Sequence, residues 1–292
     1  MNKTPSLRKW IKAPAKRGGR FSGSQICLNL VLAFGCLISM IPFIWIISTS
    51  LSHPAEALRL PPNFLPTSFF YQNYLAVFEE FPFFRFMLNS LIVALGVILL
   101  SVTISTLAAF SFARINFRFK NIIFIMLMTG LMVPSFSTII STYFILSRIG
   151  LVNTLWALIF PASVNPLHIF LLRQFMITIP KSYEEAAEID GRSRFSFFFF
   201  IVLPLTKPAL VLITLLSFIG SWNNFIGPLI YLHDFYRMTI PIGLRALQGF
   251  MGMGNIAVIL AGVTLSFLIP VLLYLFGQRY FVEGIILSGV KS

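Results

Sequence analysis

The sequence predicts an all-α membrane protein with six transmembrane helices and one short helix on the cytoplasmic side. Three observations lead to this prediction. Of the 292 residues, 57% are hydrophobic and only 11% are charged, and the mean hydropathy of +0.88 is far from soluble averages. Uncharged runs long enough to cross a bilayer recur six times, and basic residues gather in alternate connections between them. The runs are continuously apolar rather than alternating, which disfavours a β-barrel.

Each of the six runs has the length that a membrane span requires. A hydrocarbon core of about 30 Å needs roughly 20 apolar residues in helical form. The first run has its apolar centre at residues 26–48 and exceeds the ~7–15 residues of a signal-peptide core, so we interpret it as an uncleaved span. The other five lie between Arg85 and Arg114, Lys120 and Arg148, Arg148 and Arg173, Lys207 and Asp234, and Arg245 and Arg279.

The distribution of Lys and Arg predicts the orientation of these spans. Seventeen of the 22 basic residues fall in the N-terminal tail, in the connections after the second and fourth runs, and after the last run. The other five are Arg59, Arg85, Arg148, Arg237 and Arg245. Because positively charged loops stay in the cytoplasm, we expect both termini there. This topology accounts for the formal net charge of +13 without a nucleic-acid partner.

The spans divide the chain into four predicted parts. Residues 1–25 form a cytoplasmic basic tail, and residues 26–84 form the first transmembrane helix and an outer loop. Residues 85–285 form the main transmembrane domain, and residues 286–292 form a cytoplasmic C-terminal tail. The outer loop is rich in aromatic residues, which is untypical of a disordered linker, so we expect an ordered cap.

The sequence predicts no catalytic residue, cofactor site or metal site. His53, His168 and His233 are isolated, with no acid or cysteine at ligand spacing. Cys27 and Cys36 lie on different turns of one predicted helix, which excludes a disulfide between them. No glycine-rich phosphate-binding loop is present.

The six runs also lack the groups that ion-driven carriers use. They contain no Asp or Glu, whereas carriers and pumps place ionisable residues inside the membrane. If the protein moves a solute, we therefore expect the energy to come from another protein.

Four of the nine acidic residues lie in one short cytoplasmic segment, "SYEEAAEIDGRSRF". Ser182 and Glu185 have the spacing of a capping box, and Gly191 is a natural helix stop, so we expect a helix over residues 183–190. At about 100° per residue, its three glutamates group on one side. Helices that rest on a lipid leaflet present Lys and Arg, so a protein cleft is favoured over the inner leaflet as the partner of this helix.

The stretch "EAAEIDGRSRFSFFFFIVLP" resembles the cytoplasmic EAA signature of ABC importer permeases. That signature is Glu-Ala-Ala, three residues, a glycine, nine residues and Ile-x-Leu-Pro. The matching positions are Glu185, Ala186, Ala187, Asp190, Gly191, Ile201, Leu203 and Pro204. The resemblance implies the type I importer fold, with a coupling contact to an ATPase. That contact would be formed by Glu184, Glu185, Ala186, Ala187, Asp190 and Gly191.

Further segments resemble the carbohydrate-type permeases of this family, which are similar to the second permease of maltose importers. They include "FMLNSLIVA", "LPLTKPAL", "SWNNFIGPLI" and the ending "QRYFVEGIILSGVKS". The resemblance implies a bacterial or archaeal inner-membrane subunit that transports a sugar, most simply an oligosaccharide or a sugar derivative. Its implied partners are a different second permease, two ATPase subunits, an extracytoplasmic binding protein and membrane lipid.

Two alternatives to a sugar importer stay open. One is an ABC importer permease for a non-sugar solute, such as a polyol phosphate or an amino acid. The other is an autonomous channel or carrier in which the acidic helix is a regulatory docking site.

The chain departs from the family pattern at two positions. Arg192 stands where alanine is usual, and Asn224 stands where an acid is frequent. For the translocation path we select Asn165, Trp222, Asn223 and Asn224. An interfacial aromatic role is favoured for Trp222 over sugar contact.

Overall fold

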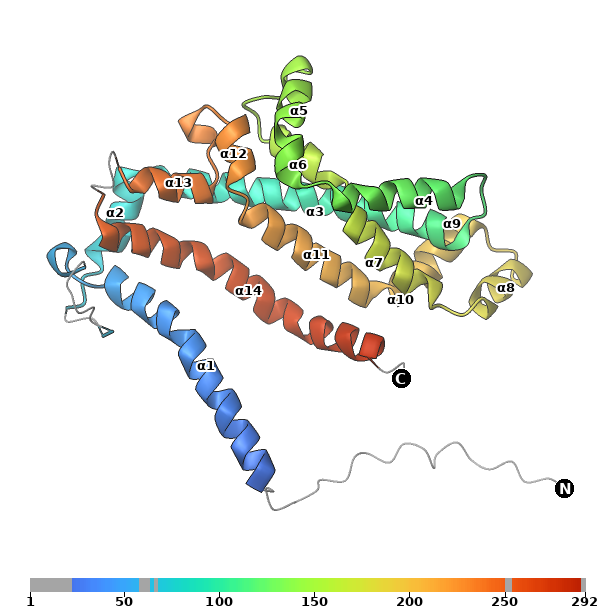
Figure 1. Cartoon of the computed structure of the whole chain (residues 1–292), viewed down its shortest axis with the longest axis horizontal. Helices are drawn as coiled ribbons and strands as arrows, with labels where there is room; N and C mark the ends of the chain where they lie inside the picture. Colours follow the sequence, from blue (N-terminus) through green and yellow to red (C-terminus); the bar gives the residue numbers. More distant parts are fainter. Residues whose placement is uncertain (1–22, 58–63, 66–67, 250–253, 290–292) are drawn as a thin grey trace. The chain divides into compact units, whose positions relative to one another are not determined.

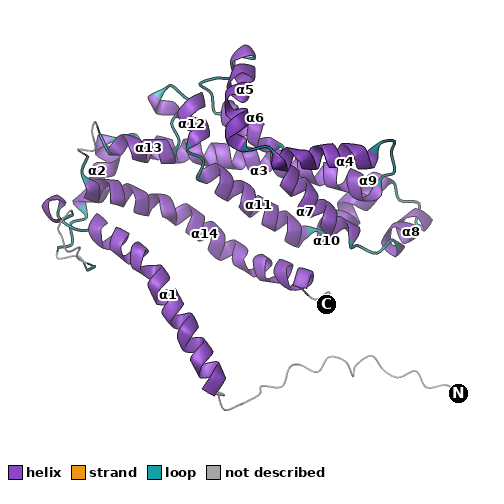
Figure 2. Ribbon diagram, in the orientation of Figure 1, coloured by secondary structure: helices purple, strands orange, loops and turns teal. Residues whose placement is uncertain are grey.

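The computed structural model describes residues 23–57, 64–65, 68–249 and 254–289. It divides into two compact units, Met1–Trp45 and Ile46–Ser292. Figure 2 shows helices and loops, and no strand, in the part of the chain that is described. Most of the predicted basic tail, residues 1–22, lies outside the described residues. The last predicted part, residues 286–292, is helical as far as residue 289.

The first unit contains most of α1 (Gly23–Ser50). None of its membrane-length window is buried, and its large apolar side chains are exposed. An apolar helix of this kind can face only lipid or another protein. Free thiols are present at Cys27 and Cys36.

The second unit is a helical bundle built around α3 (Figure 1). Its remaining elements, in chain order, are η2 (Pro54–Glu56), α2 (Gln72–Glu80), α3 (Phe83–Arg114), α4 (Lys120–Thr129), η3 (Gly130–Met132), α5 (Ser135–Arg148), α6 (Trp156–Ser163), α7 (Pro166–Ile177), α8 (Ser182–Ile189), α9 (Arg194–Phe197), η4 (Phe198–Val202), α10 (Leu203–Leu205), α11 (Lys207–Trp222), α12 (Ile226–Tyr231), η5 (Phe235–Arg237), α13 (Ile240–Leu247) and α14 (Ile256–Gly289). Helix α3 packs against α6, α7 and α11, and α11 packs against α14.

Three described helices are long and apolar enough to cross a membrane: α1, α3 and α14. Two bent helix pairs raise the number to five if each pair is one span. The predicted fourth span, between Arg148 and Arg173, is divided between the short helices α6 and α7. Val164 and Asn165 separate the two helices, and Pro166 is the first residue of α7. The count of six therefore stays a prediction.

The fifth predicted span, after Lys207, is preceded by a helical segment that bends away from it. The pair Arg194–Leu205 and Lys207–Trp222 meets at 75°. Pro204 and Pro208 flank the bend, and Thr206 between them leaves helical geometry with ψ of 5°. Proline lacks the amide that would continue the hydrogen-bond ladder, which explains a bend at this place.

The described part of the outer loop contains the helices η2 and α2. Asn73 in α2 is buried and donates from Nδ2 to the carbonyls of Ser50 and Ser52, each at 2.9 Å. The hydroxyls of Ser50 and Tyr74 lie 2.7 Å apart. Polar contacts thus hold α2 to the chain that precedes the loop.

Candidate functional site

The acidic segment forms α8, but its start differs from the prediction. Lys181 already has helical backbone angles, so Ser182 lies inside the helix rather than capping it. The amides of Glu184 and Glu185 donate to the carbonyl of Lys181, at 2.8 and 3.0 Å. The Ser182 side chain caps no amide, and the predicted capping box is wrong.

The end of α8 agrees with the prediction. Gly191 has φ of +69°, in the left-handed region that favours glycine. The amide of Gly191 donates to the carbonyl of Glu188, and the amide of Arg192 donates to that of Ala187. These two bonds form a Schellman motif, the usual glycine-dependent helix end.

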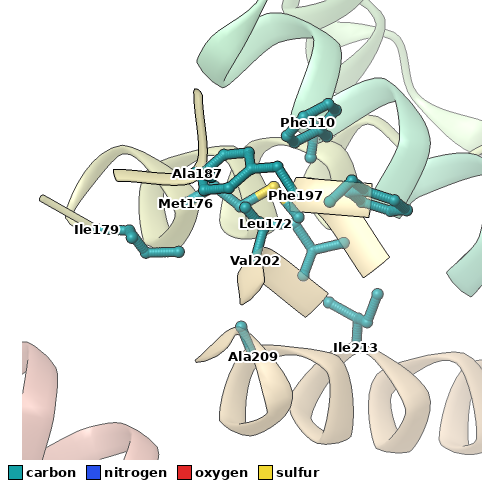
Figure 3. Packing of buried hydrophobic residues seen from close by; sticks show 11 residues of the cluster. Phe110, Leu172, Met176, Ile179, Ala187, Phe197, Val202, Ala209 and Ile213 are labelled. Carbon is teal, nitrogen blue, oxygen red and sulfur yellow. The ribbon is translucent and has the colours of Figure 1, made fainter. Parts of the chain in front are cut away.

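One face of α8 is packed into the body of the second unit. Ala187 is only 3% exposed and belongs to a cluster of buried apolar residues (Figure 3). This cluster joins α8 to α3, to α7, to the turns before α11, and to α11 itself. Its members are Ala109, Phe110, Leu172, Met176, Ile179, Ala187, Phe197, Phe198, Val202, Ala209 and Ile213. A displacement of α8 would therefore disturb three long helices at once, because close-packed side chains transmit strain.

A buried arginine holds the same face of α8. The Nη1 atom of Arg114 lies 3.5 Å from Oε2 of Glu184, and their side chains are 6% and 28% exposed. The Nη2 atom of Arg114 donates to the carbonyl of Met176 at 2.7 Å and to that of Ile179. One side chain at the end of α3 thus connects the last turn of α7, the following link and α8.

The opposite face of α8 is free of intramolecular cover. Ile189 is 86% exposed, and Glu185 and Ala186 beside it are also exposed. At about 100° per residue, Glu185 and Ile189 lie opposite the buried Ala187, and Ala186 lies on the flank beside them. Fully exposed isoleucine at the centre of a small-residue and acidic face is typical of a protein contact surface rather than of a lipid-facing one.

The six residues predicted for the coupling contact are therefore divided between two faces. Glu184 and Ala187 contact the body of the protein, whereas the other four are exposed. Glu185, Ala186, Asp190 and Gly191 form that exposed set. Arg114 and Ile189 are not among the residues predicted for the coupling contact; Arg114 contributes only to the predicted orientation of the spans. The sequence did offer one signal for Arg114. It is a basic residue at the cytoplasmic end of a predicted span, on the same side of the membrane as the acidic segment.

Arg192, the unusual residue after the glycine, is exposed at the edge of α8. Its Nη1 atom lies 3.5 Å from the Oγ atom of Ser196, at the outer limit of a hydrogen bond. Among the described residues no carboxylate forms an ion pair with it.

A second feature is a cleft of about 270 Å³ between α3, α7 and α11, which we call the amide cleft. Its polar lining consists of Asn165, His168, Ser217, Ser221 and Asn224. Among the residues that the structure describes, no Lys, Arg, Asp or Glu lines it. The structure thus brings together two of the four residues predicted for a translocation path, Asn165 and Asn224.

The side chains of both asparagines also accept hydrogen bonds from backbone amides. The Oδ1 atom of Asn165 accepts from the amide of Leu167 and caps α7, at 2.9 Å. The Oδ1 atom of Asn224 accepts from the amide of Gly227 at 3.1 Å. Their amide nitrogens remain the groups that could donate to a solute.

The other two predicted path residues do not line the amide cleft. Trp222 is 4% exposed and stacks on Phe218 with ring centroids 5.3 Å apart. It lies in an apolar cluster with Phe86, Ala94 and Ile240, so the interfacial position favoured for it is wrong. Asn223 is exposed outside the cleft.

No group of three or more His, Cys, Asp or Glu residues suited to a metal ion occurs within the described ranges. In the amide cleft the Nδ1 atom of His168 lies 3.0 Å from the hydroxyl of Ser101 and 3.5 Å from that of Ser217. The imidazole is thus held by hydroxyls from α3 and α11.

The chain is similar over most of its length to several transport permeases. An arabinooligosaccharides transport system permease protein, AraQ of Halalkalibacterium halodurans, is 32% identical over 91% of this chain and 96% of its own length. The trehalose/maltose transport system permease protein MalG of Thermococcus litoralis is 33% identical over 92% and 99%. The sn-glycerol-3-phosphate transport system permease protein UgpE of Pectobacterium atrosepticum is 29% identical over 90% and 96%.

Among solved structures, a bacterial ABC transporter involved in the import of the acidic polysaccharide alginate matches with a TM-score of 0.80 and 21% identity. The match covers 90% of this chain and 99% of that one, and it shows the fold. The predicted fold class, an all-α membrane protein of the type I ABC importer permease kind, is confirmed.

Residues 101–282 match the family described as binding-protein-dependent transport system inner membrane component. That match covers more than half of the chain and includes α8, Arg114, the buried cluster around Ala187 and most of the lining of the amide cleft. The chain therefore belongs to the binding-protein-dependent transport system inner membrane component family.

Proposed function

We propose that this chain is a permease subunit of an ATP-driven importer, and that it translocates a sugar, an oligosaccharide or a sugar derivative. The solute would be delivered by an extracytoplasmic binding protein. Hydrolysis of ATP would take place on partner subunits, because the sequence offers no phosphate-binding loop of its own.

The observation that carries the proposal is that one face of α8 is exposed while the other is packed against the bundle. Its outer face presents Glu185, Ala186 and Ile189, while its inner face is fixed by Ala187 and Glu184 to the ends of α3 and α7. A partner that moves the outer face would move the bundle, since the inner face cannot slide independently. The coupling contact would consist of the exposed residues, with Glu184 and Ala187 anchoring them.

The remaining assignments follow from this function. The chain would span the inner membrane of a bacterium or archaeon, with both termini and α8 on the ATP side. It would pair with a second, different permease and bind two ATPase subunits. The four-part division of the chain, with residues 85–285 as the permease domain, is part of the proposal.

The lining of the amide cleft supports a neutral solute. Amides, hydroxyls and one imidazole are suited to the hydroxyl groups of a sugar. The described lining residues offer no charged side chain to bind a phosphate or a carboxylate. Two relatives are named for oligosaccharide or disaccharide transport.

A polyol phosphate is the second candidate solute, because one relative is named for sn-glycerol-3-phosphate. Uptake assays with labelled oligosaccharides and with glycerol 3-phosphate in a strain that lacks other importers would separate the two. Accumulation of the phosphate alone would reject the sugar proposal.

The coupling role is tested by a matched pair of glycine substitutions. Gly191 and Gly150 have φ of +69° and +71°, neither has an atom near a built Cβ, and each ends a helix with a Schellman motif. Gly191→Val and Gly150→Val therefore impose the same local strain, of about 1–2 kcal/mol. Only the first lies beside α8.

We expect Gly191→Val to be inserted in the membrane and to abolish solute-stimulated ATP hydrolysis in the reconstituted complex. Gly150→Val should keep solute-stimulated ATP hydrolysis. Gly191→Asn should keep most activity because asparagine tolerates the left-handed region. Unchanged hydrolysis in Gly191→Val would sink the proposed coupling role.

Purification from native membrane separates this function from an autonomous carrier. An ATPase subunit should co-purify with the wild-type chain and be lost when Ile189 and Glu185 are both replaced by Lys. A chain that transports solute without any ATPase would overturn the proposal.

A further inference from the structure

A second cleft in this unit lies where α3 ends, α4 begins and α7 ends. We call it the cationic cleft. It has a volume of about 620 Å³. Its polar lining is formed by Asn116, Lys120, Asn121 and Arg173. No acidic residue of the described part of the chain lines it, so its electrostatic character is that of an anion site.

The two cations of the cleft are held by neutral groups. Lys120 donates from Nζ to the carbonyl of Ile115 at 2.9 Å. Arg173 donates from Nε to the carbonyl of Phe112 at 3.2 Å, and its guanidinium carbon lies 4.2 Å from the ring centroid of Phe124. Neither forms an ion pair with a carboxylate in the described chain. Their positive charges thus converge on the cleft without an anion from the protein.

Backbone donors add to this charge. Helix α4 begins at Lys120, and the preceding Phe119 provides no side-chain cap. Within the described residues, the amides of Asn121 and Ile122 have no backbone or side-chain acceptor. Unpaired amides at a helix start favour an anion, and two cations beside them strengthen that preference.

The surface next to the cleft is apolar. Ile122, Ile125 and Met126 on α4 are 56%, 61% and 68% exposed. Ile177, which lines the cleft, is 46% exposed. A free phosphate ion would use the cations and leave this surface bare, whereas an amphipathic anion would cover both.

We propose that the cationic cleft binds the phosphate headgroup of an anionic phospholipid, with the acyl chains lying along the exposed side of α4. Basic clefts at the cytoplasmic ends of membrane helices favour acidic headgroups, and each Lys or Arg near the surface contributes about 1 kcal/mol. The proposal needs the chain to lie in a membrane, but it does not depend on the solute or on the coupling role of α8.

The test is retention of lipid by the purified transporter that contains this chain. It would be exchanged into mixed micelles of phosphatidylcholine and phosphatidylglycerol, and the bound lipid would be counted by native mass spectrometry. We expect phosphatidylglycerol to be retained selectively. Lys120→Gln and Arg173→Gln should each weaken its retention about fivefold.

Two further variants control for charge and for folding. Arg148→Gln removes an exposed cation at the end of α5, away from the cleft, and retention should be unchanged. Lys120→Arg keeps the charge and should keep the lipid, even if Lys120→Gln proves unstable. Equal retention in the Lys120→Gln and Arg148→Gln variants would overturn the proposal.

Competition identifies the source of the phosphate. Inorganic phosphate at millimolar concentration should not displace long-chain phosphatidylglycerol, because it cannot use the apolar side of α4. Full displacement would show a simple phosphate site and reject the lipid. Retention that is insensitive to both cations would show that another subunit covers the cleft, which also rejects it.

Discussion

Two arginine–carboxylate pairs of the same length have very different surroundings. Arg114 and Glu184 lie 3.5 Å apart with side chains 6% and 28% exposed. Arg237 and Asp234 also lie 3.5 Å apart, but they are 46% and 39% exposed and only three residues apart in the chain. The first pair joins two distant segments, whereas the second lies within one turn.

The difference teaches that the distance alone does not tell what an ion pair does. Water screens the exposed pair, so its contribution is at most about 1 kcal/mol. Loss of one partner from the sheltered pair leaves a carboxylate and two carbonyls without their donor, which costs several times more. Four substitutions test this contrast, beginning with the largest expected effect.

Removal of the sheltered cation should be the most damaging change. Arg114→Gln is expected to lower the free energy of unfolding by about 3 kcal/mol, because Glu184 and the carbonyls of Met176 and Ile179 lose their donor. Thermal unfolding of the detergent-purified protein would measure the loss. Solute-stimulated ATP hydrolysis should fall as well. A variant as stable as wild type would show that the pair does not contribute to stability.

Overpacking of the inner face of α8 should come second. Ala187→Leu is expected to cost about 2 kcal/mol, because the residue is 3% exposed inside the apolar cluster. Ala186→Leu is the matched control on the outer face and should change stability by less than about 0.5 kcal/mol. If Ala186→Leu has normal stability but binds the ATPase less well, the outer face of α8 serves docking and the inner face serves stability. Equal destabilisation by both would contradict it.

Neutralisation of the sheltered carboxylate should have a smaller effect. Glu184→Gln keeps an oxygen that can accept from Arg114 but removes the charge, and Glu184 is partly exposed. We expect a loss of about 1 kcal/mol in the same unfolding assay. A loss as large as that of Arg114→Gln would mean that the charge, not the hydrogen bonds to α7, stabilises this end.

The exposed pair, Arg237 and Asp234, should contribute least to stability. Arg237→Gln is expected to change the free energy of unfolding by less than about 1 kcal/mol. The guanidinium also donates to the carbonyl of Asn153, a neutral contact. Repeating the measurement in high salt should abolish most of the difference. A loss comparable to that of Arg114→Gln would remove the contrast between the two pairs.

Much of the fold was readable from local signals. Uncharged runs predicted α1, α3 and α14, because a helix that crosses a bilayer must be long and apolar. Gly191 predicted the end of α8, since a left-handed backbone needs a residue without Cβ. The spacing of Glu185, Ala186 and Ala187 with Gly191 pointed to the family that the comparisons identify.

Other features depended on neighbours that the sequence does not reveal. The capping box failed because the backbone at Lys181 is already helical, which places Ser182 inside α8. Trp222 is covered by Phe218 and α3 rather than by the membrane interface. The third and fifth predicted spans are each bent beside prolines, at Pro134 and at Pro204 and Pro208, whose effect depends on the packing around them.

The sequence by itself determined which segments are apolar, where the acidic helix stops and to which family the chain belongs, because these follow from composition and short-range geometry. The tertiary structure decided that Ala187 faces inward and Ala186 outward, that Arg114 reaches Glu184, and that Asn165 and Asn224 meet in one cleft. Such contacts join residues far apart in the chain, so they exist only when the helices pack together.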